Sequence, residues 1–409
     1  MAIKKIICFL CMLFWLGIIW AQTFFRFTDD AEKHKYTFDL YRNIIVIPVW
    51  LNGEGPFNFI LDTGAGNCII TEPQLVNDLQ LQKGREVIIS GSGENTGERA
   101  FLVHQVTVRV KNMESLPLTM AAFEEDPFLL SEYLGCTIHG ILGYEFFNSF
   151  IVRLNYQTQV MTVFNPITFQ PNKKYTPVPI TLKNKRPFLQ GFCAYHPDTI
   201  IRLEDILIDT GAGFPISLET YSDEQIIVPE KNMNDELGVG LNGVIAGQIA
   251  RTYRFGFSNF VFEDIVTAYP EYSSTGSKQV NEQRNGSIGN FLLNRFTVVF
   301  YYAGGIMYMK PNGKLRQHFP YDRTGVEVIA TGEEYIQFLI RTVKPGSPAE
   351  EIGILPGDEI EEINFQKVTT LELSEIDHLL SNPASNSITL RIKRDNKIFY
   401  MIVEMRDLI

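Results

Sequence analysis

Short runs of hydrophobic residues, separated by polar and turn-forming residues, dominate the chain up to about residue 312. Residues 44–49 (IIVIPV) and 298–301 (VVFY) are examples, and Gly, Asn and Pro fill the spaces between such runs. Short runs rich in β-branched and aromatic residues are typical of strands, and long helical periodicity is nearly absent. The pattern therefore predicts a mainly β fold with sandwich or barrel lobes rather than an alternating βαβ sheet.

An internal repeat organises this β-rich part. Residues 59–66 (FILDTGAG) return as residues 206–213 (ILIDTGAG), and residues 140–143 (GILG) return as residues 286–289 (GSIG). The shifts are 209 − 62 = 147 and 286 − 140 = 146, so the two markers keep almost the same separation in each copy. Such a match indicates a duplicated unit.

The duplication predicts two all-β lobes, residues 36–165 and residues 176–312, each of about 130 residues, a normal size for a compact unit. A polar connection follows Pro311. A third, separate module is expected over residues 325–406, with a short helix at Pro348 and another near residues 373–380.

The repeated motif carries a carboxylate in each copy, Asp62 and Asp209. Three apolar residues precede each Asp, which is the pattern of a buried strand that ends in a carboxylate. A buried carboxylate without a partner is costly, so we expect the two copies to meet. Like charges at close range cannot both be ionised, so the pair would share a proton that belongs to neither residue alone. One carboxyl oxygen could then activate a water while its protonated partner hydrogen-bonds a carbonyl.

The Asp-Thr-Gly-Ala sequences, each with a later apolar-apolar-Gly element, resemble the aspartic peptidases and look most like the retropepsin branch. The resemblance covers about residues 36–312 and implies a bilobal double-β-barrel fold, like a covalently fused retropepsin dimer. It implies that Asp62 and Asp209 are the catalytic pair and that residues 141–143 and 288–289 pack beneath their loops. Ser287 departs from this pattern, because the first copy has Ile141 there. The residues that the resemblance implies as dyad support are Thr63, Gly64, Thr210 and Gly211.

Each lobe also has a glycine-rich segment that could form a hairpin over a substrate, at residues 91–97 and 238–243. Ordinary hairpin turns are the alternative. The second segment matches GxGxxG, but polar residues 234–236 precede it where a dinucleotide site has a buried strand, so no nucleotide cofactor is expected. The candidate flap residues are Gly91, Ser92, Gly93, Gly238, Gly240 and Gly243.

Ala65 and Ala212 follow the two Asp-Thr-Gly triplets. Pepsin-like enzymes carry Ser or Thr at this position, and that hydroxyl can favour the charged carboxylate, whereas alanine cannot. We therefore expect an activity optimum displaced from strongly acidic toward mildly acidic or near-neutral pH.

The third module resembles bacterial PDZ domains through residues 343–349 (VKPGSPA) and 356–360 (PGDEI). Such domains capture an extended C-terminal peptide by strand addition. The resemblance implies that Gly325 and Val326 lie in the loop that holds the peptide carboxylate, where Glu327 would be an unfavourable charge if its side chain points inward. A module that only braces the protease lobes is the alternative.

The N-terminus carries the pattern of a targeting segment. Two lysines precede an unbroken apolar run at residues 6–20, and the small residue Ala21 is suited to a cleavage site. Residues 1–21 are therefore expected to be a removed signal peptide. An uncleaved anchor is the alternative, because an apolar stretch at residues 6–25 approaches the roughly 20 residues that span a bilayer. The expected location is exported, periplasmic or secreted in a bacterium, or membrane-anchored if the signal is retained.

The remaining composition excludes several classes of function. The formal net charge of -11 repels phosphate backbones, so nucleic acid is not an expected partner. Cys68, Cys136 and Cys193 show no CxxC spacing, which leaves either one disulfide or buried free thiols. The six histidines are scattered and form no HExxH motif, so no metal or other cofactor is expected.

Together these features predict an exported aspartic endopeptidase that cleaves polypeptides, with a PDZ module for substrate capture or regulation. A catalytically silent, protease-like scaffold that binds peptides through the PDZ module is the alternative. Both Asp-Thr-Gly triplets are intact, which favours the enzyme.

Overall fold

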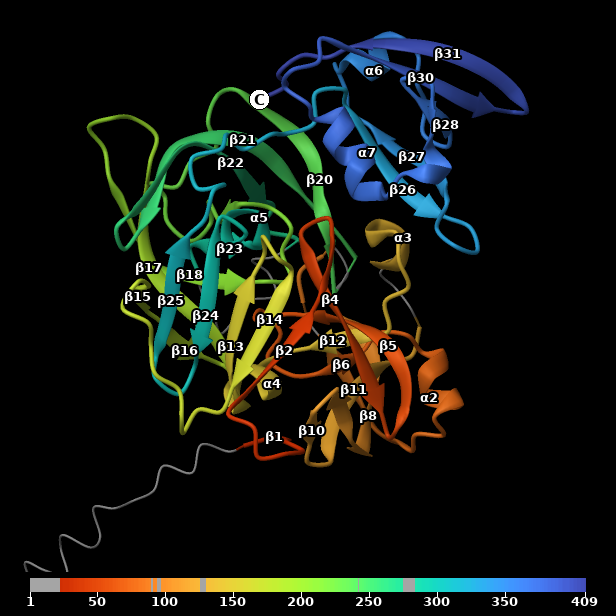
Figure 1. The fold of residues 1–409 in the computed structure, drawn as a ribbon. Helices are drawn as coiled ribbons and strands as arrows, with labels where there is room; N and C mark the ends of the chain where they lie inside the picture. Colours follow the sequence, from red (N-terminus) through yellow and green to blue (C-terminus); the bar gives the residue numbers. More distant parts are fainter. Residues whose placement is uncertain (1–22, 90, 94–96, 126–129, 242, 275–283) are drawn as a thin grey trace, which may run out of the picture.

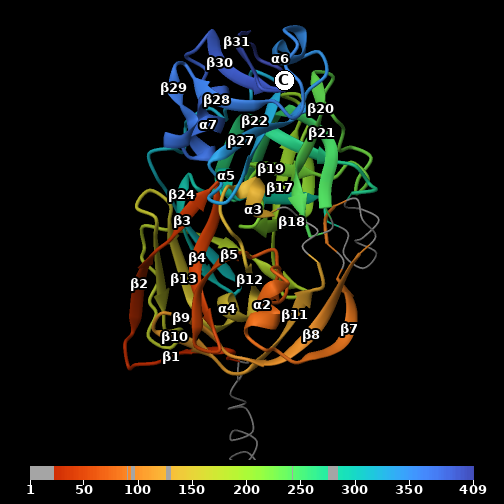
Figure 2. The same ribbon diagram turned by 90° about the vertical axis from the view of Figure 1, so that its right-hand side faces the viewer.

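The computed structural model describes residues 23–89, 91–93, 97–125, 130–241, 243–274 and 284–409. The expected signal peptide lies outside these ranges. The chain is mainly β, as the hydrophobic pattern predicts, and the strands within these ranges form four sheets. Figures 1 and 2 show their arrangement.

The first lobe is built on a sheet that has 11 strands among the described residues. Its long hairpin is made by β4 and β5, and the buried run Ile44–Leu51 makes β4 a core strand. The short strand β12 inserts in parallel beside β5, so the two repeat markers of this lobe are neighbours in the sheet. In sheet order the strands are β1 (Phe25–Phe27), β10 (Met113–Ser115), β9 (Val108–Val110), β4 (Ile44–Leu51), β5 (Glu54–Leu61), β12 (Gly140–Leu142), β6 (Ile69–Ile70), β11 (Leu118–Phe123), β8 (Glu98–Val106) and β7 (Lys83–Ile89), with β3 (Asp39–Tyr41) paired to β4.

The second lobe repeats this arrangement. The strand that ends in Asp209 lies parallel to β23, just as β5 lies parallel to β12. Its order is β16 (Thr181–Lys183), β17 (Arg186–Ala194), β18 (Ile201–Asp209), β23 (Gly286–Gly289), β19 (Ile216–Leu218), β22 (Phe260–Pro270), β21 (Gly243–Phe257) and β20 (Asn232–Gly240).

A third sheet joins the two lobes. Strand β13 of lobe 1 pairs antiparallel with β24 of lobe 2, with Val152 opposite Phe300 and Leu154 opposite Val298. These four side chains are buried, so the junction is part of one hydrophobic core that extends through both lobes. The order is β15 (Thr176–Pro179), β25 (Ile306–Pro311), β24 (Phe296–Tyr301), β13 (Ile151–Asn155), β14 (Val160–Phe164) and β2 (Lys33–Thr37).

The C-terminal module has its own sheet and a separate hydrophobic core. Helix α6 begins as the sequence predicts, because the Ser347 hydroxyl accepts the amide of Glu350 at 3.3 Å and Pro348 lies in the first turn. The sheet order is β26 (Val326–Thr331), β27 (Gln337–Val343), β28 (Glu359–Ile363), β30 (Ser387–Arg394) and β31 (Lys397–Glu404), with β29 (Gln366–Lys367) beside β28.

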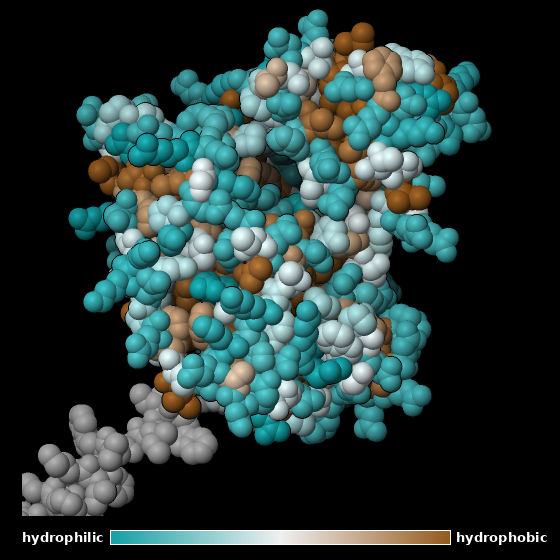
Figure 3. All heavy atoms as spheres, viewed as in Figure 1, coloured by the Kyte–Doolittle hydropathy of each residue, from teal (hydrophilic) through white to brown (hydrophobic). Residues whose placement is uncertain are grey.

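Helices are short and lie between or beside the sheets. They are α2 (Gln74–Asp78), α3 (Leu130–Leu134), α4 (Tyr144–Ser149), α5 (Asn290–Leu293), α6 (Pro348–Glu351), α7 (Leu373–Leu380) and the 3-10 turn η2 (Val368–Thr370). Within the part of the chain that the structure describes, none is long and apolar enough to cross a bilayer. The space-filling view shows a largely polar face with apolar side chains in several places, some of them over the C-terminal module (Figure 3). The edge strand β31 exposes Ile398 and Ile402.

Candidate active site

Two aspartates end equivalent strands of the two lobes. Asp62 directly follows β5, and Asp209 is the last residue of β18. The Gly64 amide donates to Oδ1 of Asp62 at 2.6 Å, and the Gly211 amide donates to Oδ1 of Asp209 at 2.9 Å. The duplicated sequence therefore produces the same local hydrogen bond twice.

The two loops lie so close that each glycine touches the opposite carboxylate. A Cβ atom built on Gly64 would lie 2.7 Å from Oδ1 of Asp209, and one on Gly211 would lie 2.6 Å from Oδ2 of Asp62. Because real Cβ atoms are not found at such distances, a larger residue at either glycine would have to displace the carboxylate of the other lobe. The structure thus brings together the two carboxylates that the repeat predicts.

Burial and, after it, the charge of Asp209 raise the pKa of the Asp62 carboxyl well above its ordinary value. A hydrogen bond between the two carboxyl groups raises this pKa further, whereas the Gly64 amide and the positive charge of Arg186 lower it. Two like charges in a buried site do not both ionise, so the pair retains a proton over a wide pH range.

The threonines of the two loops bond across the lobe interface. Oγ1 of Thr63 donates to the carbonyl of Ile208 at 2.7 Å, and Oγ1 of Thr210 donates to the carbonyl of Leu61 at 2.8 Å. Each hydroxyl also accepts the main-chain amide of the other threonine, at 2.9 and 3.0 Å. Both threonines are buried, so these four bonds hold the two loops in one relative position.

The later glycines of the repeat pack against the backs of the loops. A Cβ atom on Gly143 would lie 2.5 Å from the carbonyl oxygen of Ala65, and one on Gly289 would lie 2.7 Å from that of Ala212. Ser287, the departure from the first copy, is accommodated by a hydroxyl pair with Ser217 at 2.8 Å.

Two side chains near the dyad loops were not predicted from the sequence. Asn290 donates from Nδ2 to the carbonyl of Thr210 at 2.6 Å and accepts the hydroxyl of Tyr156 at 2.7 Å. Tyr302 is buried, and among the described residues its hydroxyl has no hydrogen-bond partner. Burial first, and then the charges of Asp62 and Asp209, raise the pKa of Tyr302 well above its usual value. The only feature of the sequence that could have indicated one of these residues is the position of Asn290, directly after the marker at residues 286–289.

The described residues of the two glycine-rich segments lie at the ends of two hairpins, β7–β8 and β20–β21, which meet across the lobes. A Cβ atom on Gly240 would lie 2.2 Å from the carbonyl oxygen of Ser92, and the Gly93 amide donates to the carbonyl of Ser274 at 2.8 Å. Val239 and Leu241 at the end of β20 pack against a hydrophobic cluster of lobe 1. The candidate residues Gly91, Gly238 and Gly243 lie in the same hairpins, whereas residues 94–96 and 242 are outside the described ranges.

In the C-terminal module, the amide of Gly325 donates to the carboxylate of Asp322 at 2.9 Å, and that of Val326 faces the Thr324 hydroxyl at 3.4 Å. Burial raises the pKa of Glu327, whose carboxylate accepts the Thr342 hydroxyl at 3.2 Å. The loop expected to hold a peptide carboxylate thus already binds the carboxylate of Asp322.

Cys68, Cys136 and Cys193 are free thiols, and two of them, Cys68 and Cys193, are buried. Among the described residues, no group of three or more His, Cys, Asp or Glu side chains is arranged as metal ligands.

Two protein-family models match parts of this chain. A model described as aspartyl protease matches residues 47–146, and a model of the PDZ domain matches residues 339–394. Two curated proteins, from Brucella suis and Brucella melitensis, are each 33% identical over 67 residues, which is 16% of this chain and 17% of theirs. Their names call them zinc metalloproteases, and the matched stretch covers less than a fifth of their length. The chain therefore contains an aspartyl protease domain followed, at its C-terminal end, by a PDZ domain.

Proposed function

We propose that the chain is an aspartic endopeptidase in which Asp62 and Asp209 together activate a water molecule. The mutual approach of the two carboxylates is the observation that carries this proposal, because each lies against the glycine of the opposite loop. The raised pKa of Asp62 supports a shared proton, which this chemistry requires.

In the proposed reaction, the carboxyl group of the pair that carries the shared proton hydrogen-bonds the oxygen of the scissile carbonyl. The other carboxylate of the pair removes a proton from the water, whose oxygen forms a bond to the carbonyl carbon. The same group then gives this proton to the nitrogen as the C–N bond breaks, and the carboxyl product and the amine leave. Main-chain amides of Gly64 and Gly211 keep one oxygen of each carboxylate fixed throughout.

The two hairpins β7–β8 and β20–β21 would act as flaps over the bound polypeptide. Their ends meet at Ser92 and Gly240, which supports a lid made by both lobes. We further propose that the protein is exported and that its PDZ module captures or regulates substrates.

The test is cleavage of casein, an unstructured polypeptide, by the mature chain and by Asp62→Asn and Asp209→Asn variants, with new termini identified by mass spectrometry. We expect the unmodified chain to cleave casein and neither dyad variant to do so. Asp205→Asn is the matched control, because Asp205 lies on the same strand, β18, and pairs with Lys183 instead of the dyad. Equal cleavage by the chain and both dyad variants would end the proposal, and cleavage by none of them would favour the silent scaffold.

A further inference from the structure

The groove between β26 and α7 of the PDZ module is partly occupied by lobe 1. Strand β26 is the edge strand of its sheet and pairs on one side with β27. The other side of β26 is the edge at which PDZ domains add a peptide strand. In this chain that edge faces the β3–β4 hairpin and helix α3 (Figure 1).

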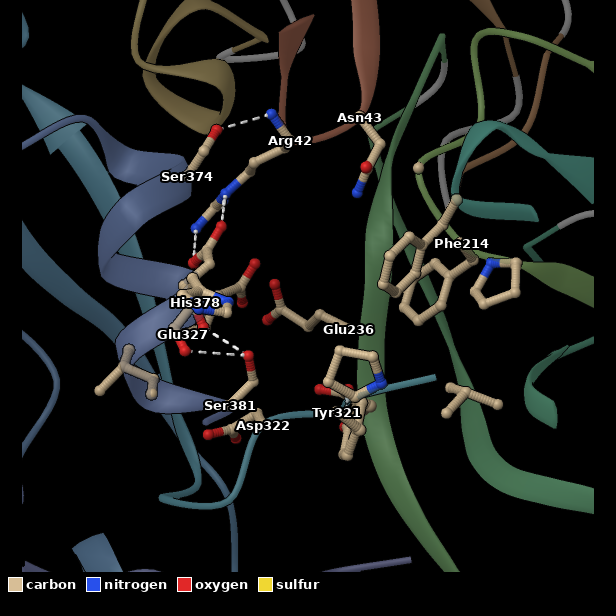
Figure 4. A pocket seen from close by; sticks show the side chains of 18 of the residues that line it. Arg42, Asn43, Phe214, Glu236, Tyr321, Asp322, Glu327, Ser374, His378 and Ser381 are labelled. Atoms are coloured by element: carbon tan, nitrogen blue, oxygen red, sulfur yellow. Dashed lines mark hydrogen bonds and ion pairs between the residues drawn. The ribbon is translucent and has the colours of Figure 1, made fainter. Parts of the chain in front are cut away.

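Arg42, in the two-residue turn between β3 and β4, enters this groove. Its guanidinium donates to the carbonyl of Val328 on β26 at 2.6 Å, and to both carboxylate oxygens of Asp377 on α7 at 2.7 and 2.9 Å. Its main-chain amide donates to the hydroxyl of Ser374 at 3.0 Å. Figure 4 shows this side chain reaching α7. One residue of lobe 1 therefore bonds both walls of the groove.

Helix α3 adds a second contact with the groove. Arg42 also donates to the carbonyl of Tyr133 at 2.9 Å and lies over the Tyr133 ring, 4.8 Å from its centroid. A Cβ atom on Gly135, in the turn after α3, would lie 3.3 Å from the Cβ of Leu373 on α7 and 3.4 Å from that of Ala330 on β26. The turn is thus in van der Waals contact with both walls.

Lobe 2 contacts the module beside the same groove. Lys344 pairs with Asp235 of β20 at 3.2 Å, and Arg341 pairs with Glu236 of β20 at 3.0 Å. A cavity of about 440 Å³ remains in this groove beside Arg42, lined by Val326 and Glu327 of β26 and by Asp377 and His378 of α7 (Figure 4). The module is therefore held by both lobes, and Arg42 is the contact that lies in its peptide groove.

We propose that lobe 1 is the internal ligand of this PDZ groove: Arg42 and the turn after α3 occupy part of the space between β26 and α7 and hold the module against the protease lobes. An external peptide has to displace Arg42 before it adds to β26. These contacts form whether or not the dyad is catalytic.

The test is hydrogen–deuterium exchange of the full chain, followed in peptides that cover β26 and α7. We expect Arg42→Ala to raise deuterium uptake in both elements by about tenfold in rate, because charge-assisted bonds to both walls are lost. Asp377→Asn should produce a smaller rise, and the double variant should not exceed Arg42→Ala, since the two residues act through one contact.

Lys185→Ala is the matched control. Lys185 lies in the equivalent two-residue turn of lobe 2, also at positive φ, and its ammonium group donates to Asn67 instead of the PDZ module. If β26 and α7 take up deuterium at the same rate in Arg42→Ala as in the unmodified chain, the proposal is wrong. A rise spread equally over the strands of lobe 1 would also contradict it, because Arg42 would then stabilise its own lobe and not the docking.

Discussion

The main-chain amide of Thr63 donates to the hydroxyl of Thr210 at 2.9 Å, and the amide of Thr210 returns the same bond to Thr63 at 3.0 Å. The two residues are 147 positions apart and occupy the same place in the two copies of the repeat. This reciprocal contact fixes the relative position of the aspartates that precede them.

Thr63→Val is expected to destabilise the chain by about 2 kcal/mol, because it removes one buried donor and leaves the Thr210 amide without its acceptor. It should also lower kcat, since the carboxylates lose their fixed geometry. Chemical denaturation and peptidase assays measure the two effects. Thr252→Val is the matched control: Thr252 is an equally buried threonine that bonds Thr267 and Tyr269 within lobe 2, so it should reduce stability and leave kcat unchanged. Equal losses of kcat in both variants would contradict the prediction.

Gly64→Ala is expected to abolish cleavage, because its Cβ would lie 2.7 Å from Oδ1 of Asp209 and push that carboxylate away from Asp62. Gly66→Ala is the control, since its Cβ would make an ordinary contact of 3.4 Å with the carbonyl oxygen of Asn184. The measurement is the rate of cleavage by each variant, compared with that of the unmodified chain. Activity that survives Gly64→Ala at more than about a tenth of the original rate would refute the close approach of the two loops.

The pH dependence of kcat/KM should have its maximum at mildly acidic to near-neutral pH. The raised pKa of Asp62 keeps the shared proton in place as pH rises, and activity is lost only when pH exceeds that raised value and both carboxylates ionise. Ala65→Ser should move the profile to lower pH, because a hydroxyl near the carboxylate favours its charged form. A maximum at about pH 2 for the unmodified chain would contradict this account.

Asp62→Asn should make the melting temperature less sensitive to pH. A carboxyl whose pKa is higher in the folded than in the unfolded chain gives stability that is fully present below the unfolded pKa and is lost as pH rises through the folded pKa. Removing it should therefore raise the melting temperature relative to the unmodified chain at neutral pH and less so near about pH 4. Thermal unfolding over a pH series checks this, with Asp205→Asn as control. If the melting temperatures of Asp62→Asn and the unmodified chain differ by the same amount at every pH, the raised pKa is not the cause of the difference.

Gly240→Ala is expected to lower kcat/KM by about tenfold, because its Cβ would lie 2.2 Å from the carbonyl oxygen of Ser92 and force the two hairpin ends apart. Melting temperature should change little, because the contact lies at hairpin ends and not in the core. Steady-state kinetics and thermal unfolding separate the effects. Unchanged kcat/KM would show that the hairpins do not need to meet over the substrate.

The sequence by itself determined the β-rich class, the duplicated lobes, the two aspartates with their threonines and glycines, and the PDZ module. These features are encoded locally: alternation marks strands, small residues mark turns, and a repeat displays the same local structure twice. The capping of α6 by Ser347 was readable for the same reason.

The tertiary structure alone decided how the lobes join and how the PDZ module docks. Three contacts between distant residues show this: the pairing of β13 with β24, the bond from Asn290 to Thr210, and the ion pair of Arg42 with Asp377. The last of them joins residues that are 335 positions apart. Such contacts depend on the shapes of several assembled elements, and no local pattern contains them. Arg42 appears in the sequence as an ordinary turn residue, and only the packed groove between β26 and α7 makes it a ligand.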